Sequence, residues 1–276
     1  MSAIEILKAD GTKEEFSSEK LSASLKKAGA SEEEVTTIVA EIESELKPLM
    51  KTADIYRHAF SLLQSDVPKG TQARYALKRA IFDFGPSGFP FEAYAAELFR
   101  TRGYEASTNA IAKGKCVDHE IDVLLKKDGI TTYVEAKFHN TPGFKTDLKV
   151  VLYVKARIDD IRAREGDSVQ GLVLTNTKFT SMAREYGSCA GLPLMGWDYP
   201  HSFDLHALIG GSGLYPITAL SSLSHREKEA LLAQKIVLCR DLPRHADLLK
   251  GLGLNTSRID TLFTEVGALC GAPIPV

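Results

Sequence analysis

Three charged side chains stand at a spacing that could bind a metal ion. Asp122 lies in a short apolar segment, and Glu135 and Lys137 lie two positions apart at the end of the next one. Residues two apart on a strand point to the same face, and Asp128-Gly129 between the segments favours a tight hairpin. Pairing across that hairpin would bring Asp122 beside Glu135. Two neighbouring carboxylates repel each other unless a cation lies between them, and hard oxygen ligands suit Mg²⁺ or Mn²⁺.

A third acid belongs to the same constellation. Glu92 lies near the start of a helix expected from Pro90 to Arg102, beside its apolar face. A bound ion could stabilise the charge on a phosphorane and lower the pKa of a water, and Lys137 could act there as a point charge or a proton acceptor. The pattern alone is common in strands that end in charged residues. Its place between a helix with an early acid and a basic helix favours the catalytic interpretation.

The elements that must position these residues follow an α/β order. Up to residue 84 the sequence predicts a short hairpin and four helices, and the run Gly85–Gly88 then breaks the pattern. After the break, helices and strands alternate along the chain, which favours a mixed central sheet. The elements expected after the break are a helix at 90–102, strands at 121–125 and 131–136, a long helix at about 145–164, a strand at 170–175, a helix at about 181–187 and a strand at 193–197.

We therefore expect an α+β or α/β chain of three parts. These are a mainly helical part (1–85), a mixed-sheet α/β core (86–210) and a helical C-terminal region (211–276). In the last part, Gly251 and Gly253 form a turn between helices that resembles a helix–hairpin–helix, whose glycine amides could meet a DNA phosphate. A plain helical turn capped by glycine explains the same residues.

Five segments between residues 89 and 205 carry a family resemblance: FPFEAYAAELFRTRGYEA, GKCVDHEIDVLL, TTYVEAKF, GLVLTNTKFTSMAREYG and LPLMGWDYP. In this order they resemble the Mrr-type branch of the PD-(D/E)xK restriction-endonuclease-like superfamily. The resemblance implies Mg²⁺- or Mn²⁺-dependent hydrolysis of DNA. It makes Glu92 the helix acid, Asp122 and Glu135 the metal-binding acids, and Lys137 the catalytic lysine. Many Mrr-type members carry Gln at the position of Glu135, so this chain keeps the fuller acidic set.

The N-terminal segment ILKADGTKEEFSSEKLSASLKKAGAS, with the helices after it, resembles the ATP-cone, a nucleotide-binding regulatory module, over residues 3–84. The resemblance implies a site for ATP or dATP. Ala9 departs from the family, which often has a second base there, so the cone could also serve only in dimerisation or docking. The contacting positions implied are Lys8, Glu14, Ser17, Lys20, Leu21, Thr52 and Tyr56.

Basic residues also gather on the long helix. Phosphate binding needs a local basic surface more than a basic chain, and a solvated helix face is the alternative. His119, close to Asp122, could touch the phosphate or the metal shell, although a structural surface histidine is favoured. The residues expected to follow the DNA backbone are Lys145, Lys149, Lys155 and Arg157.

Composition limits the class of protein. The 276 residues carry 44% hydrophobic and 25% charged side chains and a net charge of −2, values usual for a globular chain. No apolar run is long enough to span a membrane, and the start has no apolar leader. The four cysteines form no CxxC pair, which argues against a zinc site or a disulfide framework. We therefore expect a cytoplasmic protein with no membrane partner.

The leading hypothesis is a Mg²⁺-dependent endodeoxyribonuclease that is regulated or assembled by nucleotide. Cleavage of both strands with one active site per chain would favour a homodimer. The alternative is a non-catalytic module that binds DNA or a partner protein, its assembly switched by nucleotide. A pure binder has no need of buried acids, because they repel phosphate. An enzyme of nucleotide metabolism is a third reading of the cone, but the chain shows no thiol pair for that chemistry.

Overall fold

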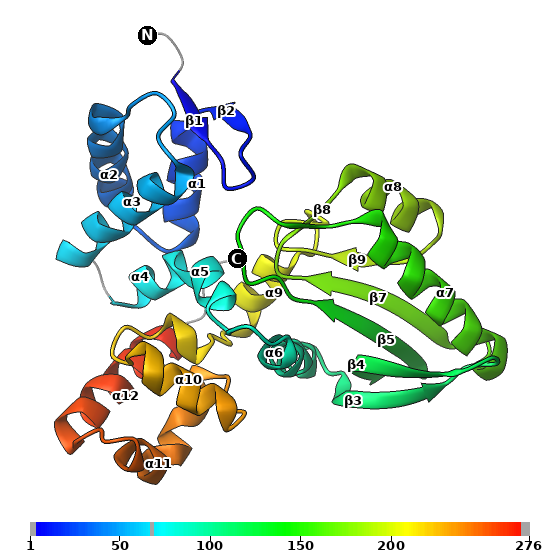
Figure 1. The fold of residues 1–276 in the computed structure, drawn as a ribbon. Helices are drawn as coiled ribbons and strands as arrows, with labels where there is room; N and C mark the ends of the chain where they lie inside the picture. The colour runs from blue at the N-terminus through cyan, green and yellow to red at the C-terminus, as the bar shows by residue number, and fades with distance from the viewer. Residues whose placement is uncertain (1–3, 67–68, 272–276) are drawn as a thin grey trace.

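The computed structural model describes residues 4–66 and 69–271, and its N-terminal group is the predicted hairpin with its helices (Figure 1). Ser17 caps the first helix, and Ser31 with Glu34 forms a capping box on the second. The apolar faces of these helices meet in a small core of their own. The elements are β1 (Glu5–Leu7), β2 (Lys13–Glu15), α1 (Ser18–Lys27), α2 (Glu32–Glu45) and α3 (Thr52–Asp66).

Two short helices join this group to the rest of the molecule. The single helix predicted from about Gly70 to Phe84 is divided into α4 (Lys69–Tyr75) and α5 (Leu77–Phe82), with Ala76 between them. Helix α4 contacts the last helix of the chain, so the N-terminal and C-terminal groups lie side by side.

The middle part contains a five-stranded mixed sheet in the order β3-β4-β5-β7-β9. Neighbours from β3 to β5 are antiparallel, whereas β5, β7 and β9 are parallel. Asp128 and Gly129, with φ of 50° and 77°, close the predicted hairpin between β4 and β5. The strands are β3 (Glu105–Lys113), β4 (Asp118–Lys127), β5 (Ile130–Lys137), β7 (Val169–Thr175) and β9 (Leu194–Met195).

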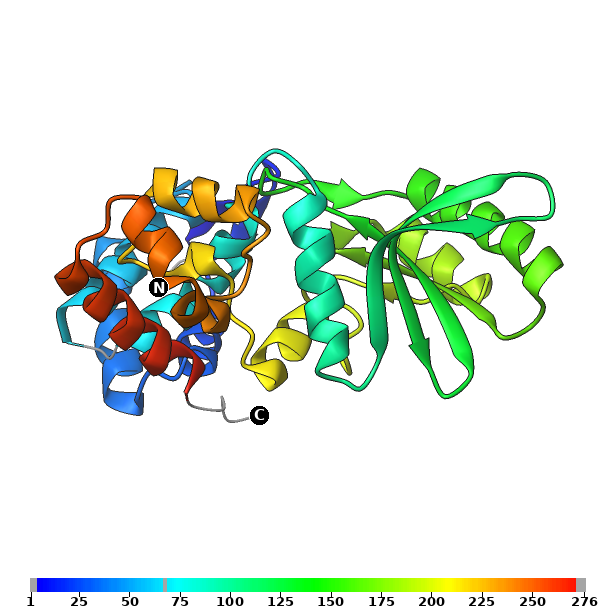
Figure 2. The same ribbon diagram turned by 90° about the horizontal axis from the view of Figure 1, so that it is seen from below.

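Helices cover both faces of this sheet, which confirms the predicted fold class (Figures 1 and 2). One face carries α6 and α9, and the other carries α7 and α8, each with its own apolar cluster. A separate parallel pair, β6 and β8, lies beside the sheet. The bounds are α6 (Phe89–Arg100), β6 (Lys145–Thr146), α7 (Leu148–Glu165), β8 (Lys178–Phe179), α8 (Ser181–Cys189) and α9 (Leu205–Ser212).

The β3–β4 hairpin bends where Asn109 lies opposite Asp122. The strand ladder pairs the residues on either side but omits these two. Asn109 has a φ of 54°, a conformation that a short polar side chain tolerates. As a result Val123 packs in the cluster under α6, whereas Ile121 packs in the cluster under α7. Asp122 therefore lies at the point where the strand changes face.

The C-terminal part is helical, as predicted, and is joined to the sheet by a continuous core. The apolar cluster under α6 includes Leu77, Phe91 and Leu262, so it crosses the divisions proposed at residues 85 and 210, which remain a prediction. Glu265, only 3% exposed, accepts hydrogen bonds from Ser221 and Ser222 inside this part. The elements are η1 (Ile217–Ala219), α10 (His225–Ala233), η2 (Cys239–His245), α11 (Ala246–Gly251) and α12 (Thr256–Cys270).

Seen from below, the helical parts form one lobe and the sheet forms the other, with α6 between them (Figure 2). None of the helices in the described part of the chain has both the length and the apolar character that crossing a membrane requires.

Candidate active site

Asp122 is held at the bend of β4 by the neighbouring strand. The last residues that pair between β4 and β5 are Val123 and Val134. Beyond them, Oδ2 of Asp122 accepts the backbone N–H of Ala136 at 2.8 Å. The carboxylate thus replaces a backbone acceptor, and this fixes Asp122 beside the C-terminal end of β5.

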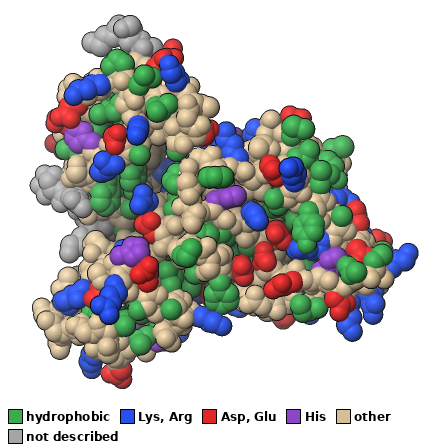
Figure 3. All heavy atoms as spheres, viewed as in Figure 1, with side chains coloured by type: hydrophobic (Ala, Val, Ile, Leu, Met, Phe, Trp, Pro, Cys, Tyr) green, Lys and Arg blue, Asp and Glu red, His purple; other side chains and the backbone are tan. Residues whose placement is uncertain are grey.

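Further carboxylates surround Asp122. Burial raises the pKa of Glu92 to about 7, and the charges of Asp122, Glu120 and Glu135 add to the effect. Burial, followed by the charge of Glu135, also raises the pKa of Asp122 to about 6. Figure 3 shows acidic side chains gathered beside α6 at the end of β5. Half-buried carboxylates that repel one another favour a bound cation. Glu120 also belongs to this group of acids, although the sequence analysis gave it no role. Its position two residues before Asp122 could have indicated that its side chain lies near the site.

Glu135 is paired with a base on the α7 side of the sheet. Nη1 of Arg157 donates to Oε2 of Glu135 at 2.6 Å, and Nη2 donates to the hydroxyl of Tyr153 at 2.8 Å. The side chains of Arg157 and Glu135 are 10% and 16% exposed. The sequence predicts Arg157 as a DNA contact. The structure places it against a proposed metal ligand instead, because α7 turns this face toward β5.

Lys137 ends β5 and is exposed, two residues beyond Glu135 and therefore on the same face of the strand. It lies opposite Thr175 of β7. Burial, and then the charge of Lys137, lowers the pKa of His139, which lies in the loop after the strand. The charges of Asp122 and Glu135 both act on Glu92, so these three acids lie near one another, and Lys137 lies at the C-terminal end of β5.

The donor set suits a divalent ion. Oδ1 of Asp122 has no partner among the described residues, while Oδ2 is held by the strand. Asp122 and Glu92 can therefore supply hard oxygen ligands of the kind that Mg²⁺ prefers. Glu135 can join them through Oε1, which has no partner among the described residues, while Oε2 accepts from Arg157.

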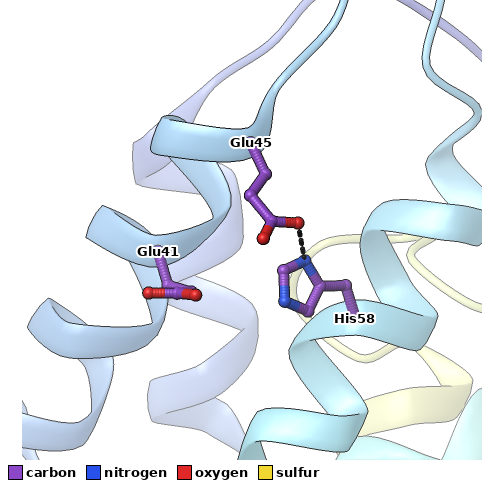
Figure 4. A group of neighbouring side chains, drawn as sticks. All are labelled: Glu41, Glu45 and His58. Atoms are coloured by element: carbon purple, nitrogen blue, oxygen red, sulfur yellow. Dashed lines mark ion pairs between the residues drawn. The ribbon is translucent and has the colours of Figure 1, made fainter.

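A second group of ligand atoms lies far from the sheet, between α2 and α3 (Figure 4). Glu41, Glu45 and His58 are the only set of three acidic, histidine or cysteine side chains in residues 4–66 and 69–271 whose ligand atoms all lie within 4.8 Å of one another. Both glutamates are exposed, and Nδ1 of His58 lies 3.4 Å from Glu45. No further feature points to a ligand, so we treat the group as a surface ion pair.

Most of the bases expected to follow DNA are paired with acids. Lys145 forms an ion pair with Asp10 of the N-terminal hairpin at 3.0 Å, and Lys155 forms one with Asp159 at 2.5 Å. Lys149 is exposed in the first turn of α7. Of the four predicted contacts, Lys149 is thus the one that the structure leaves open to a phosphate.

His119 is bound to α7. Its Nε2 lies 2.8 Å from Oδ2 of Asp160, and Oδ1 of Asp160 accepts the backbone N–H of Cys116 at 2.9 Å. The hydrogen bond from His119 lowers the pKa of Asp160 to about 2. These bonds tie the tip of the β3–β4 hairpin to α7. His119 therefore has the structural role that was the alternative to a phosphate or metal contact.

Three of the predicted nucleotide positions share a cavity of about 850 Å³. Lys20, Thr52 and Tyr56 line it, from α1 and α3. The ring of Tyr56 stacks on Tyr75, with the centroids 5.1 Å apart and the planes 6° apart. The wall of the cavity therefore contains both a cation, Lys20, and an aromatic surface formed by Tyr56 and Tyr75.

The remaining predicted positions have other contacts. Glu14 forms ion pairs with Lys8 and, at 3.1 Å, with Lys20. Ser17 accepts the backbone N–H of Lys20 as the cap of α1, and Leu21 is buried in the N-terminal core. The structure does not bring these residues to the cavity, apart from Lys20.

Three family models match consecutive stretches of the chain. They describe an ATP cone domain (residues 4–57), a restriction endonuclease (residues 86–197) and the C-terminal region of AF1548-like proteins (residues 215–270). Both predicted resemblances are thereby confirmed: the middle of the chain is a restriction-endonuclease-like domain, and an ATP-cone precedes it.

An uncharacterised protein of Archaeoglobus fulgidus is 35% identical over 177 residues, which cover 64% of this chain and 99% of the relative. The crystal structure of AF1548, a protein of unknown function, is 33% identical, covers 67% of this chain and 99% of that one, and has a TM-score of 0.56. The chain belongs to the AF1548-like family.

Two more distant solved structures each match less than half of this chain. A repair endonuclease from Pyrococcus abyssi is 20% identical over 40% of this chain and 46% of its own, with a TM-score of 0.33. EndoMS in the EndoMS-dsDNA2 complex is 17% identical over 41% of this chain and 45% of its own, with a TM-score of 0.30. Such low scores support no inference about the site.

Proposed function

We propose that the protein is a metal-dependent endonuclease that hydrolyses DNA phosphodiesters at the end of β5. The observation that carries the proposal is the group of half-buried carboxylates around Asp122, which is fixed by the backbone N–H of Ala136 and has a raised pKa. A group of this kind repels phosphate unless a cation is bound. The restriction endonuclease model that matches this stretch supports the same chemistry.

Each residue has a distinct role in this proposal. When bound, Mg²⁺ or Mn²⁺ would supply charge stabilisation at the phosphate and would acidify a water. Asp122 and Glu92 provide ligand oxygens, and Glu135 adds a third through Oε1 while Oε2 stays paired with Arg157. Lys137, exposed at the open end of the strand, holds a positive charge where a phosphate can approach.

The test is cleavage of double-stranded DNA by the purified protein with and without Mg²⁺. Lys137→Met and Asp122→Asn should each lower the rate by about 10²–10⁴-fold while the circular dichroism spectrum stays unchanged. Lys126→Met, at an exposed position of β4, is the matched control and should cleave normally. If the wild-type protein binds DNA but never cleaves it, the non-catalytic binding module becomes the better account.

We also infer that the N-terminal part binds ATP or dATP. The cavity with Lys20, Thr52 and Tyr56 supports this function, because a cation and a stacked aromatic pair can hold a phosphate and a base. The match to the ATP cone domain supports it independently. Isothermal titration with ATP tests it, and the absence of measurable heat at millimolar ATP would contradict it.

A further inference from the structure

The walls of the cavity come from more than the cone. Tyr56 belongs to the stretch that matches the ATP cone domain, but Lys78 comes from α5, outside that stretch. Pro142, Trp197 and His206 also line the cavity, and they belong to the restriction-endonuclease-like part or directly follow it. A molecule bound here would touch both parts of the protein. Figure 3 shows a hollow between them with basic side chains along it.

The charged side chains that line the cavity are all basic. The described residues that line the cavity include no Asp or Glu. A concave surface with one sign of charge concentrates counter-ions and favours a ligand with several negative charges. The basic side chains in the lining are Lys20, Lys27, Arg57, Arg74, Lys78 and Arg79.

Lys78 is half-buried and has no anionic partner among the described residues, whereas Lys27 is exposed. The ammonium of Lys78 forms no ion pair or hydrogen bond with a described residue and lies 5.4 Å from the centroid of the Trp197 ring. The nearby acid Asp198 is already paired with Lys178 at 2.7 Å. Burial, followed by the charge of Lys178, lowers the pKa of Lys78. A half-buried cation without an anion is unfavourable, and a phosphate in the cavity would relieve it.

The half-buried Trp197 belongs to the wall that the restriction-endonuclease-like part contributes. Trp197 packs against the apolar cluster under α6, and its ring lies 5.2 Å from that of His206. The stacked rings of Tyr56 and Tyr75 form an aromatic surface on the side of the cone. The cavity therefore offers aromatic faces from both parts and a cluster of cations, as a nucleotide requires.

We propose that a nucleoside triphosphate binds across the interface between the cone and the nuclease part, with Lys78 as a phosphate ligand and Trp197 as part of the wall. This inference rests on the proposed nucleotide binding of the cone and adds the residues outside it that complete the site. Nucleotide binding thereby links the two parts.

Trp197 is the chain's single tryptophan, so its fluorescence reports on this wall directly. We expect ATP to change that fluorescence with the same Kd that isothermal titration gives. Lys78→Met should raise that Kd about 10-fold or more. The control is Lys26→Met, because Lys26 pairs with Glu32 outside the cavity; it should leave the Kd unchanged.

If ATP binds, either of two results would overturn the proposal: an unchanged Trp197 fluorescence, or an equal Kd for wild type and Lys78→Met. Absence of ATP binding to the wild-type protein would overturn it as well, together with the nucleotide function of the cone. The nuclease assay is separate. A protein that binds ATP with the expected dependence on Lys78 but cleaves no DNA would refute the nuclease function and leave this site standing.

Discussion

The carboxylate of Asp122 accepts the backbone N–H of Ala136 at 2.8 Å, directly beyond the last paired residues of β4 and β5. The two strands separate at this point, and a side chain fills the place of the missing ladder bond. The strand end therefore holds the acid in one position without consuming both of its oxygens. The predictions below follow from this arrangement and from the contacts around it.

The raised pKa values predict how stability depends on pH. The folded pKa values of Asp122 (about 6) and Glu92 (about 7) exceed their ordinary values of 3.8 and 4.5. The native state thus binds more protons than the unfolded state in this window, so the free energy of unfolding falls as the pH rises from about 4 to 7. Without metal, Asp122→Asn should be more stable than wild type at pH 8 by about 1 kcal/mol after screening. Urea unfolding in EDTA at pH 5 and pH 8 measures this, and identical pH profiles for the two proteins would contradict it.

Arg157 should affect the pKa of Asp122 and the stability of Glu135 in the folded protein. Its charge lowers the pKa of Asp122, and Arg157→Met removes that charge and leaves Glu135 unpaired. We expect a loss of about 2–3 kcal/mol in stability and a shift of the acid limb of the cleavage profile to higher pH. Arg164→Met, at an exposed position of the same helix, is the control for both measurements. A pH profile that stays in place would show that Arg157 does not act on the site.

Glu265 should stabilise the C-terminal part. It accepts the backbone N–H groups of Ser221 at 2.6 Å and Ser222 at 2.8 Å, and both hydroxyls as well. Glu265→Gln leaves one acceptor oxygen for these donors and should cost about 2–3 kcal/mol. The exposed Glu229→Gln should cost almost nothing. Thermal unfolding measures the difference, and equal midpoints would refute the role of Glu265.

The segment after Lys137 should carry the effect of nucleotide to the nuclease site. It leads to Gly143, where an added Cβ would lie 2.8 Å from the backbone of Ala9, and to Lys145, which pairs with Asp10 at 3.0 Å. Asp10→Asn should leave the Kd of ATP unchanged and reduce, by up to about fivefold, the change that ATP produces in the cleavage rate. Glu5→Gln, which breaks another ion pair of the same hairpin, is the control. An undiminished ATP response in Asp10→Asn would contradict this path.

Local patterns in the sequence were sufficient to predict several elements of the fold. The capping box at Ser31, the turn at Asp128-Gly129 and the strand that ends in Lys137 all depend on residues close together in the chain. Strand β3 was missed because EASTNAIAK offers small and polar side chains and only weak apolar alternation at the edge of a sheet.

Contacts between distant residues could not be predicted in this way. The orientation of Arg157 toward Glu135 depends on how α7 is rotated over the sheet. The approach of Lys78 to Trp197 depends on how α5 packs against the nuclease part. Periodicity gives the face of a helix but not the partner that this face meets.

The position of the metal ion is the most direct test of the proposed chemistry. A crystal soaked in Mn²⁺ and measured at the manganese absorption edge would show where the ion binds. We predict an anomalous peak in contact with Asp122 and Glu92 at the end of β5. Manganese bound only at Glu41, Glu45 and His58, with nothing beside Asp122, would contradict the account.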